Sequence, residues 1–168
     1  MSQDAKWYAL YTNPRAEKKV EAELQKHGFE VYLPLQETIR QWSDRKKKVL
    51  SPLFNSYIFV HINPERSYYD ILSVQGVVKF VKIGKDLIPI PSEQIEAIRL
   101  SLLHYSELEI SSEQLEISDR VEVTSGPLRG VKGFVSDVNG NKRLAIAIEQ
   151  IGSHLLVQVP LAYLKKIN

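Results

Sequence analysis

The sequence contains no cysteine and only four histidines. Without cysteine there can be no disulfide bonds or thiolate metal sites. The histidines are too scattered to suggest a zinc ligand set: His27, His61, His104 and His154. No apolar run reaches the roughly 18 residues that a membrane-spanning helix needs, and the N-terminal residues lack the apolar stretch of a secretory signal. We therefore expect a cytoplasmic protein with no membrane partner, no metal and no cofactor.

The common catalytic and nucleotide-binding motifs are missing as well. The sequence has no HExxH, no GxxxxGKS/T, no GxSxG and no GxGxxG after a strand. The segment SGPLRG at residues 125–130 is similar to a phosphate-binding loop, but no Lys-Ser/Thr pair follows it and Pro127 has no N–H to donate. A turn whose glycines adopt positive φ is the favoured interpretation. We expect no catalytic residues and no enzymatic activity.

The charge of the chain is small overall but unevenly distributed. Of the 168 residues, 43% are hydrophobic, which is ample for a core, and the net charge of +2 does not by itself indicate an anionic partner. Residues 106–119 carry five acidic side chains and no basic ones. This shift in composition predicts an acidic linker at residues 106–118, between a first domain at 5–105 and a second at 119–168.

The first domain interleaves strand and helix patterns. Strands are predicted around residues 7–11, 30–32, 38–42, 47–50, 55–61 and 77–83, and helices around 13–27, 65–73 and 92–105. Asn13 and Pro14 are favoured at the start of a helix, and Gly28 is suited to its left-handed end. Most connections are too short for parallel crossovers, so the pattern favours an antiparallel α+β fold.

The pattern of the second domain predicts short strands and no helix. Strands are predicted around residues 120–124, 133–138, 144–148, 154–159 and 163–166, with Asn139-Gly140 as a tight hairpin turn. In residues 144–148 the large side chains alternate with alanine, which is typical of a strand in a small closed barrel.

Two groups of residues resemble a known pair of modules. Residues 119–135 resemble the KOW motif, with its Gly-Pro turn and a glycine ahead of the next strand, here Gly126, Pro127, Gly130 and Gly133. KOW barrels also occur in ribosomal proteins. Upstream, Trp7-Tyr8, Pro52-Leu-Phe54 and Tyr57-Ile-Phe-Val60 fall in the order seen in the NGN domain of NusG-type transcription elongation factors. The resemblance covers nearly the whole chain.

The resemblance implies a monomeric transcription factor that performs no chemistry. It implies an α+β NGN domain that binds RNA polymerase and suppresses pausing or termination. A small all-β KOW (SH3-like) barrel would follow it and bind a ribosomal protein or a termination factor. Asn55-Ser56 stands where general NusG proteins usually carry Pro-Gly. That departure favours a specialised, RfaH-like antiterminator of particular operons, with a housekeeping NusG or a KOW-type ribosome-associated RNA-binding protein as the alternatives.

The predicted strand at residues 55–61 carries large apolar or aromatic side chains on both faces. A period of two places Ile58 and Val60 on one face and Tyr57 and Phe59 on the other. One interpretation is a central strand packed between helices. The resemblance implies instead an aromatic concavity for the clamp helices of RNA polymerase, with the candidates Tyr11, Phe54, Tyr57, Phe59 and Phe80.

Two basic segments are candidates for nucleic-acid binding. Five cations lie in residues 40–48, around a hairpin tip predicted at Ser43-Asp44, and a basic stripe runs along the predicted helix at residues 13–27. The alternatives are a solvated hairpin and a salt-bridged helix face. The resemblance implies that the hairpin points toward upstream DNA and that the helix touches the non-template strand. The candidates are Asn13, Arg15, Lys18, Lys19, Arg45, Lys46 and Lys47.

Overall fold

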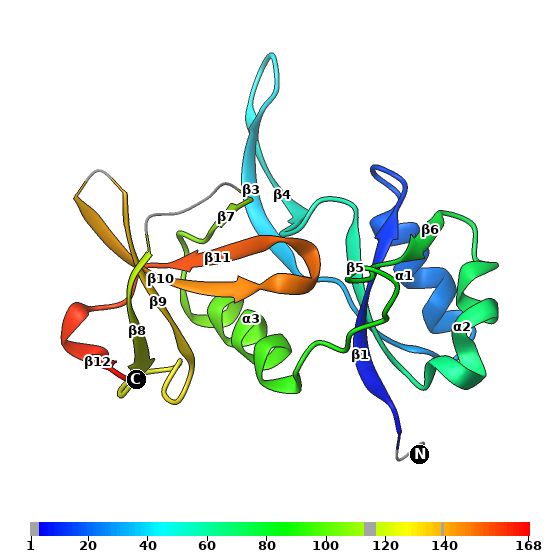
Figure 1. The fold of residues 1–168 in the computed structure, drawn as a ribbon. Helices are drawn as coiled ribbons and strands as arrows, with labels where there is room; N and C mark the ends of the chain where they lie inside the picture. The colour runs from blue at the N-terminus through cyan, green and yellow to red at the C-terminus, as the bar shows by residue number, and fades with distance from the viewer. Residues whose placement is uncertain (1–3, 113–116, 139) are drawn as a thin grey trace. The chain divides into compact units, whose positions relative to one another are not determined.

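The computed structural model describes residues 4–112, 117–138 and 140–168. The chain divides into two compact units whose boundary falls between Ile90 and Pro91 (Figure 1). Each unit is built on antiparallel strands, and the helices and strands together confirm the predicted fold class. Within the described ranges, no helix combines the length and the apolar character needed to cross a membrane.

The first unit centres on a four-stranded antiparallel sheet with the order β2-β5-β1-β6. The central strands are β1 (Lys6–Thr12) and β5 (Tyr57–Ile62), and the edge strands are β2 (Glu30–Tyr32) and β6 (Val77–Phe80). The register places Tyr8 opposite Val60 and Leu10 opposite Ile58. Because side chains alternate along a strand, these four share one face of the sheet.

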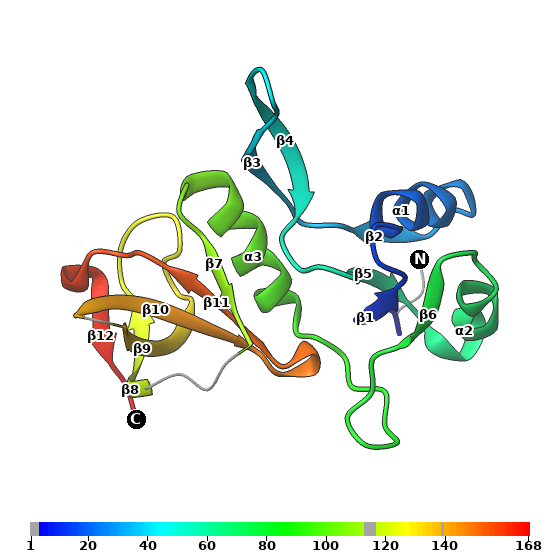
Figure 2. The same cartoon turned by 90° about the horizontal axis from the view of Figure 1, so that it is seen from above.

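Two helices cover that face. Figure 2 shows α1 (Glu17–Lys26) and α2 (Pro64–Leu72) on the same side of the sheet. Val20 and Leu24 of α1 and Ile71 of α2 are fully buried in one cluster with the sheet residues. Burial of each such side chain contributes about 1.5–3 kcal/mol relative to leaving it exposed. One hydrophobic cluster of the first unit therefore lies between the helices and this face.

The first helix begins later than predicted. Residues 13–16 form a turn in which the Ala16 N–H donates to the Asn13 carbonyl at 3.1 Å, and Arg15 has φ +66°. A residue in this left-handed conformation cannot continue a right-handed helix, so the predicted start at Asn13 was wrong. The predicted stop is confirmed, because the helix ends at Lys26 and Gly28, just past the C-cap His27, has φ +81°.

A separate hairpin extends away from the four-stranded sheet (Figure 1). It consists of β3 (Leu35–Gln41) and β4 (Lys46–Pro52), which pair only with each other among the strands of the described chain. At the tip the Trp42 N–H donates to the Arg45 carbonyl at 2.7 Å. The hairpin tip predicted around Ser43-Asp44 is therefore confirmed.

The second unit contains α3 (Ser92–His104) and a six-stranded antiparallel sheet with the order β12-β8-β9-β10-β11-β7. The strands are β7 (Glu109–Ser111), β8 (Ile117–Val123), β9 (Lys132–Val138), β10 (Asn141–Ile148), β11 (Ser153–Val157) and β12 (Leu164–Lys166), with short 3-10 turns at Glu149–Ile151 and Leu161–Tyr163. Leu144, Ile146 and Ile148 of β10 are buried, as the alternation predicted.

The hairpin between β9 and β10 follows the predicted turn closely. Val138 is paired with Asn141, which leaves two residues in the loop. Gly140 has φ +82° and its N–H donates to a carboxylate oxygen of Asp137 at 3.0 Å. The other residue of the predicted turn, Asn139, lies outside the described residues.

Helix α3 and strand β7 belong to the second compact unit, whereas the composition predicted a first domain at 5–105 that includes the helix. The Gln94 side-chain amide donates to the Ala147 carbonyl of β10 at 2.9 Å, and β7 pairs with β11. The described part of the acidic segment therefore includes a paired strand. Residues 113–116 of the expected linker lie outside the described residues.

Gly133 is the glycine of the second unit with the closest neighbours. A Cβ atom there would lie 2.6 Å from the Ala145 carbonyl oxygen and 3.0 Å from Leu144 Cδ1. The oxygen belongs to the neighbouring strand β10, so it cannot withdraw without disturbing the sheet. We expect Gly133→Ala to lower the free energy of unfolding of the full chain by about 2 kcal/mol, measured by urea denaturation.

Gly130→Ala is the matched control for this prediction. Gly130 has φ +89°, but a Cβ atom added there would have no neighbour within 4 Å, so only backbone strain opposes the substitution. We expect a loss of about 1 kcal/mol there. If Gly133→Ala were no more destabilising than Gly130→Ala, the close approach of β10 would not be what requires glycine at position 133.

Candidate functional site

The face of the first sheet opposite α1 and α2 carries a row of rings. The register places Trp7 opposite His61, Ala9 opposite Phe59, and Tyr11 opposite Tyr57. These residues alternate with the core residues of the same strands, so their side chains share the second face. We call this row, together with two rings that contact Phe59, the aromatic face: Trp7, Tyr11, Tyr32, Phe54, Tyr57, Phe59 and His61.

Ring contacts connect the members of the aromatic face. The ring centroids of Tyr11 and Tyr57 lie 5.5 Å apart in an edge-to-face arrangement, and those of Phe54 and Phe59 lie 5.9 Å apart at nearly a right angle. Tyr32 stacks on Phe59 at 6.4 Å. These distances fall in the range that favours aromatic pairs, so each pair contributes favourable packing on this face.

The aromatic face differs in exposure along its length. Phe54 and Phe59 are almost fully buried, at 3% and 0% exposed, whereas Tyr11, Tyr32 and Tyr57 are half-buried. The tyrosines therefore offer the accessible ring surface of this face.

The structure brings together four of the five predicted aromatic candidates, Tyr11, Phe54, Tyr57 and Phe59. The fifth, Phe80, is paired with Leu10 and lies in the core on the helix side, where its ring stacks on Tyr68 at 4.8 Å. Phe80 therefore lies on the opposite face of the sheet from the other four candidates, and we leave it out of the candidate interface.

Sequence reasoning did not assign Trp7 or Tyr32 to this face. For Trp7 the signal was available, because counting back from Tyr11 in steps of two along a strand leads to Ala9 and Trp7. For Tyr32 no local signal existed, since its place depends on the pairing of β2 with β5.

Two turns meet at the buried carboxylate of Glu17. Its side-chain oxygen accepts hydrogen bonds from the Arg15 N–H at 3.0 Å and from the Ser56 N–H at 3.3 Å. Both partners have left-handed backbone, with φ +66° and +68°. Such a conformation costs a non-glycine residue about 1–2 kcal/mol, so Glu17 helps to hold two strained turns together.

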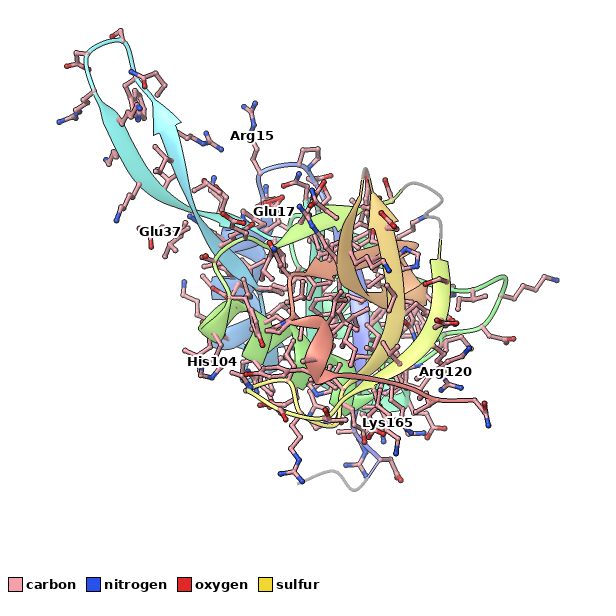
Figure 3. The ribbon with its side chains drawn as sticks, turned by 90° about the vertical axis from the view of Figure 1, so that its left-hand side faces the viewer. Arg15, Glu17, Glu37, His104, Arg120 and Lys165 are labelled. Carbon is pink, nitrogen blue, oxygen red and sulfur yellow. The ribbon has the colours of Figure 1, made fainter. Side chains whose placement is uncertain are left out.

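Beside these turns lies an open groove of about 460 Å³. Its cationic lining comes from Arg15, Lys18 and Arg40, and its polar lining includes Asn55 and Ser56. The Arg15 side chain is exposed and extends outward from the turn before α1 (Figure 3). A groove with this lining has the cations and hydrogen-bonding groups that a phosphate or a nucleotide base requires.

Lys18 is partly committed within the protein. Its ammonium donates to the Leu50 carbonyl of the hairpin at 2.8 Å. It also lies near the Glu21 carboxyl, whose pKa is raised by burial, while the Leu33 backbone N–H and Lys18 act in the lowering direction. Lys18 therefore anchors the base of the hairpin as well as lining the groove.

The predicted basic stripe of the first helix is divided between two grooves. Asn13 and Lys19 line a second groove of about 650 Å³, between α1 and residues 73–76, while Arg15 and Lys18 line the first. Four of the predicted nucleic-acid candidates thus line two different grooves. The late start of α1 explains this division, because Asn13 and Arg15 do not follow helical spacing.

The other three candidates, Arg45, Lys46 and Lys47, are exposed at the end of the hairpin. They form no ion pair within the part of the chain that the structure describes, whereas Lys48 pairs with Glu37 at 3.6 Å. Lys47 lies directly opposite Arg40 in the register. Like charges in opposed positions destabilise a sheet, so this two-stranded hairpin carries an electrostatic cost that an anion would relieve.

The segment at residues 125–130 is a turn between strands, as predicted. Gly126 and Gly130 have φ +83° and +89°, and Leu128 between them is fully buried. The Gly130 N–H donates to the Val123 carbonyl at 2.8 Å. The loop is therefore closed on its own backbone and is built differently from a phosphate-binding loop.

Comparisons with known proteins agree on one family. A family model described as "NusG: Transcription termination factor nusG" matches residues 5–99, more than half of the chain. The transcription termination/antitermination protein NusG of Staphylococcus epidermidis is 26% identical over 176 residues, covering 96% of each chain. The protein of the same name from Borreliella burgdorferi is 25% identical over 182 residues, covering 96% of this chain and 98% of its own.

A solved structure described as "Domain interaction in Thermotoga maritima NusG" also matches this fold. It is 25% identical in sequence and covers 98% of both chains with a TM-score of 0.53. A fold of helices and antiparallel sheets that ends in a series of β-strands, in a sequence without the common catalytic motifs, thus matches a class of transcription termination and antitermination factors. The chain belongs to the NusG family. This family is one of transcription factors and is not a known class of enzymes.

Removal of the Glu17 carboxylate should destabilise the first unit. In Glu17→Ala two N–H groups lose their acceptor while the strained turns remain, so we expect the free energy of unfolding to fall by about 2 kcal/mol. Glu17→Gln is the control, because its amide oxygen can accept the same bonds, and it should lose less than half as much. Urea denaturation of the three proteins measures both values, and equal losses in the two variants would contradict this role.

Proposed function

We propose that this chain is a transcription elongation and antitermination factor that binds RNA polymerase through the aromatic face. The proposal keeps an NGN domain at residues 5–105, a linker at 106–118 and a KOW domain at 119–168. The observation that carries it is the convergence of Tyr11, Phe54, Tyr57 and Phe59 on the sheet face opposite the core. A sheet face lined with rings is suited to bury an apolar partner such as a pair of helices.

The energetics favour the rings over the charges as the source of affinity. Truncation of an aromatic anchor at an interface typically costs about 2 kcal/mol or more, and an exposed ion pair contributes about 0–1 kcal/mol. Tyr11 and Tyr57 have accessible ring surface, and their edge-to-face contact fixes both rings before binding. Such preorganisation lowers the entropic cost of association.

The mechanism is differential binding and not chemistry. A factor that binds the elongating state of the polymerase more tightly than the paused state shifts the population by that difference in affinity. In this scheme the aromatic face supplies the affinity for polymerase, and the hairpin cations contact the phosphates of upstream DNA. The KOW domain recruits a ribosomal protein or a termination factor.

Phosphate contacts position the factor without reading sequence. A preference for particular operons therefore requires contacts to bases. The groove beside Arg15 is the candidate site for such contacts with bases of the non-template strand. Asn55 and Ser56 line this groove at the place where the resemblance leads one to expect Pro-Gly. This lining supports a specialised, RfaH-like factor over a housekeeping NusG.

A ribosome-associated RNA-binding protein is the alternative that the KOW motif alone supports. It leaves the aromatic face without a partner. Co-purification separates the two functions, since polymerase subunits are expected for the proposed function and ribosomal subunits without polymerase for the alternative.

Tyr57→Ala should weaken the binding of RNA polymerase while the protein remains folded. The side chain is half-buried at the aromatic face, so its loss removes an anchor but leaves Ile58 and Val60 of the core in place. We expect an affinity loss of at least about 2 kcal/mol in a titration with purified elongation complex.

Tyr69→Ala is the matched control for Tyr57→Ala. Tyr69 lies on α2, away from the aromatic face, and is 81% exposed. Its truncation should leave the affinity unchanged. If Tyr57→Ala bound the complex as tightly as the Tyr69 variant, polymerase would not contact the aromatic face at this ring.

Replacing Arg45, Lys46 and Lys47 together by alanine should reduce the salt dependence of DNA binding. Each duplex phosphate that is no longer neutralised lowers the slope of log K against log salt by about 0.9, so three lost contacts lower it by up to about 2.7. The measurement is a titration of the full chain with duplex DNA at several salt concentrations.

The control removes three exposed cations elsewhere in the first unit, at Lys26, Lys82 and Lys85. It changes the net charge equally but leaves the hairpin intact. A slope that changes by the same amount in both variants would indicate a general charge effect and would exclude a specific contact by the hairpin.

A further inference from the structure

The hairpin carries exposed apolar side chains in addition to its cations. Trp42 at the tip is 53% exposed, and Ile39 and Leu50 on the strands are 66% and 54% exposed. Trp7, the other tryptophan of the chain, is only 8% exposed. A tryptophan left in solvent beside a cluster of cations is not needed for the fold and is not explained by phosphate contact.

The tip places the ring of Trp42 and the cations on one closed turn. The hydrogen bond from the Trp42 N–H to the Arg45 carbonyl, 2.7 Å long, joins the two residues, and Lys46 follows directly on β4. The turn between the strands spans residues 42–45 and is the end of a hairpin only two strands wide. A ring in this position can reach into a narrow space that a broad sheet cannot enter.

We propose that Trp42 stacks on an unpaired base of single-stranded DNA while Arg45 and Lys46 contact the flanking phosphates. This inference rests on the proposed contact of the hairpin with DNA, and it adds a binding site for a nucleobase. Aromatic stacking on a base tolerates any sequence, because every base has a π face. The neighbouring cations match the backbone charge on both sides of that base.

A base suits this tip better than a protein surface does. A stable protein interface buries about 800 Å² on each partner and has few lysines at its centre. The tip offers one large ring among exposed Arg45, Lys46 and Lys47, which is too little apolar surface and too much charge for such a centre. One ring between cations is sufficient for one base between phosphates.

An unpaired base also suits the tip better than a paired one. Within a duplex the base faces are covered by their neighbours, so a ring can stack only after base steps are separated, which costs a few kcal/mol. In a single strand, or at the fork where a duplex opens, the faces are accessible. Trp42 should therefore distinguish single-stranded and forked DNA from blunt duplex DNA, which the cations alone do not.

The test compares the full-length protein with Trp42→Ala, Trp42→Leu and Trp42→Phe. The probes are a 12-nucleotide single strand, a forked duplex and a blunt duplex of the same sequence. Trp42→Ala and Trp42→Leu should lose about tenfold in affinity for the single strand and the fork. They should lose less than twofold for the blunt duplex, and Trp42→Phe, which keeps a ring, should fall between them and the unsubstituted protein.

Intrinsic fluorescence gives an independent readout. Single-stranded DNA should quench the tryptophan emission of the exposed Trp42, and in Trp42→Phe, where the buried Trp7 is the remaining tryptophan, the quenching should disappear. Leu50→Ala, which removes an exposed apolar side chain of the same hairpin, is the control and should leave the affinity and the quenching unchanged.

The outcomes separate this inference from the proposed function. If Trp42→Ala bound all three probes normally while the Arg45, Lys46 and Lys47 variant had a lower salt slope, the hairpin would contact phosphates only and the inference would be overturned. If neither variant changed DNA binding, the proposed contact between the hairpin and DNA would be contradicted as well. A loss confined to binding of the polymerase would show that Trp42 docks on protein, which would also overturn the inference.

Discussion

The pairing of β1 with β5 is the constraint on which the rest of the first unit depends. Both strands carry large apolar side chains on both faces, and helices α1 and α2 cover only one of them. The rings of the second face therefore contact one another, with Tyr11 against Tyr57 and Phe54 against Phe59. On this face Tyr11 and Tyr57 keep accessible ring surface, while Phe54 and Phe59 are buried. The alternation that builds the fold therefore also positions the proposed interface.

Glu17 connects this sheet to the groove beside the hairpin. By accepting N–H groups from Arg15 and Ser56, it ties the turn before α1 to the turn before β5. Ser56 adopts a backbone conformation that favours glycine, at the place where the resemblance leads one to expect Pro-Gly. Compared with glycine, serine at this position has a higher backbone conformational cost but adds a polar side chain to the groove. The hydrogen bond from the Ser56 N–H to the buried Glu17 carboxylate offsets part of that cost. Fold and candidate site are in this way held by the same bonds.

Much of the fold followed from local patterns, and the exceptions have long-range causes. Alternation located β5, and Gly28 and the hairpin tip were predictable from their turn chemistry. The late start of α1 was not predictable, because Asn13 and Pro14 favour a helix start but Arg15 adopts left-handed backbone, in a turn whose Glu17 carboxylate also binds Ser56 far along the chain. Phe80 was misplaced for a similar reason, since only its pairing with Leu10 decides which face of the sheet it joins.

Helix α3 shows that a module defined by sequence and a unit defined by packing need not coincide. The family match extends to residue 99, past the boundary at Ile90 and well into α3. Its apolar stripe, with Ile95 and Ile98 buried, was predictable from helical spacing, but a stripe does not specify its partner. An amphipathic helix can bury this stripe against one surface at a time. The hydrogen bond from Gln94 to Ala147 joins α3 to the sheet of the second unit. Helix α3 therefore contributes to the stability of the second unit.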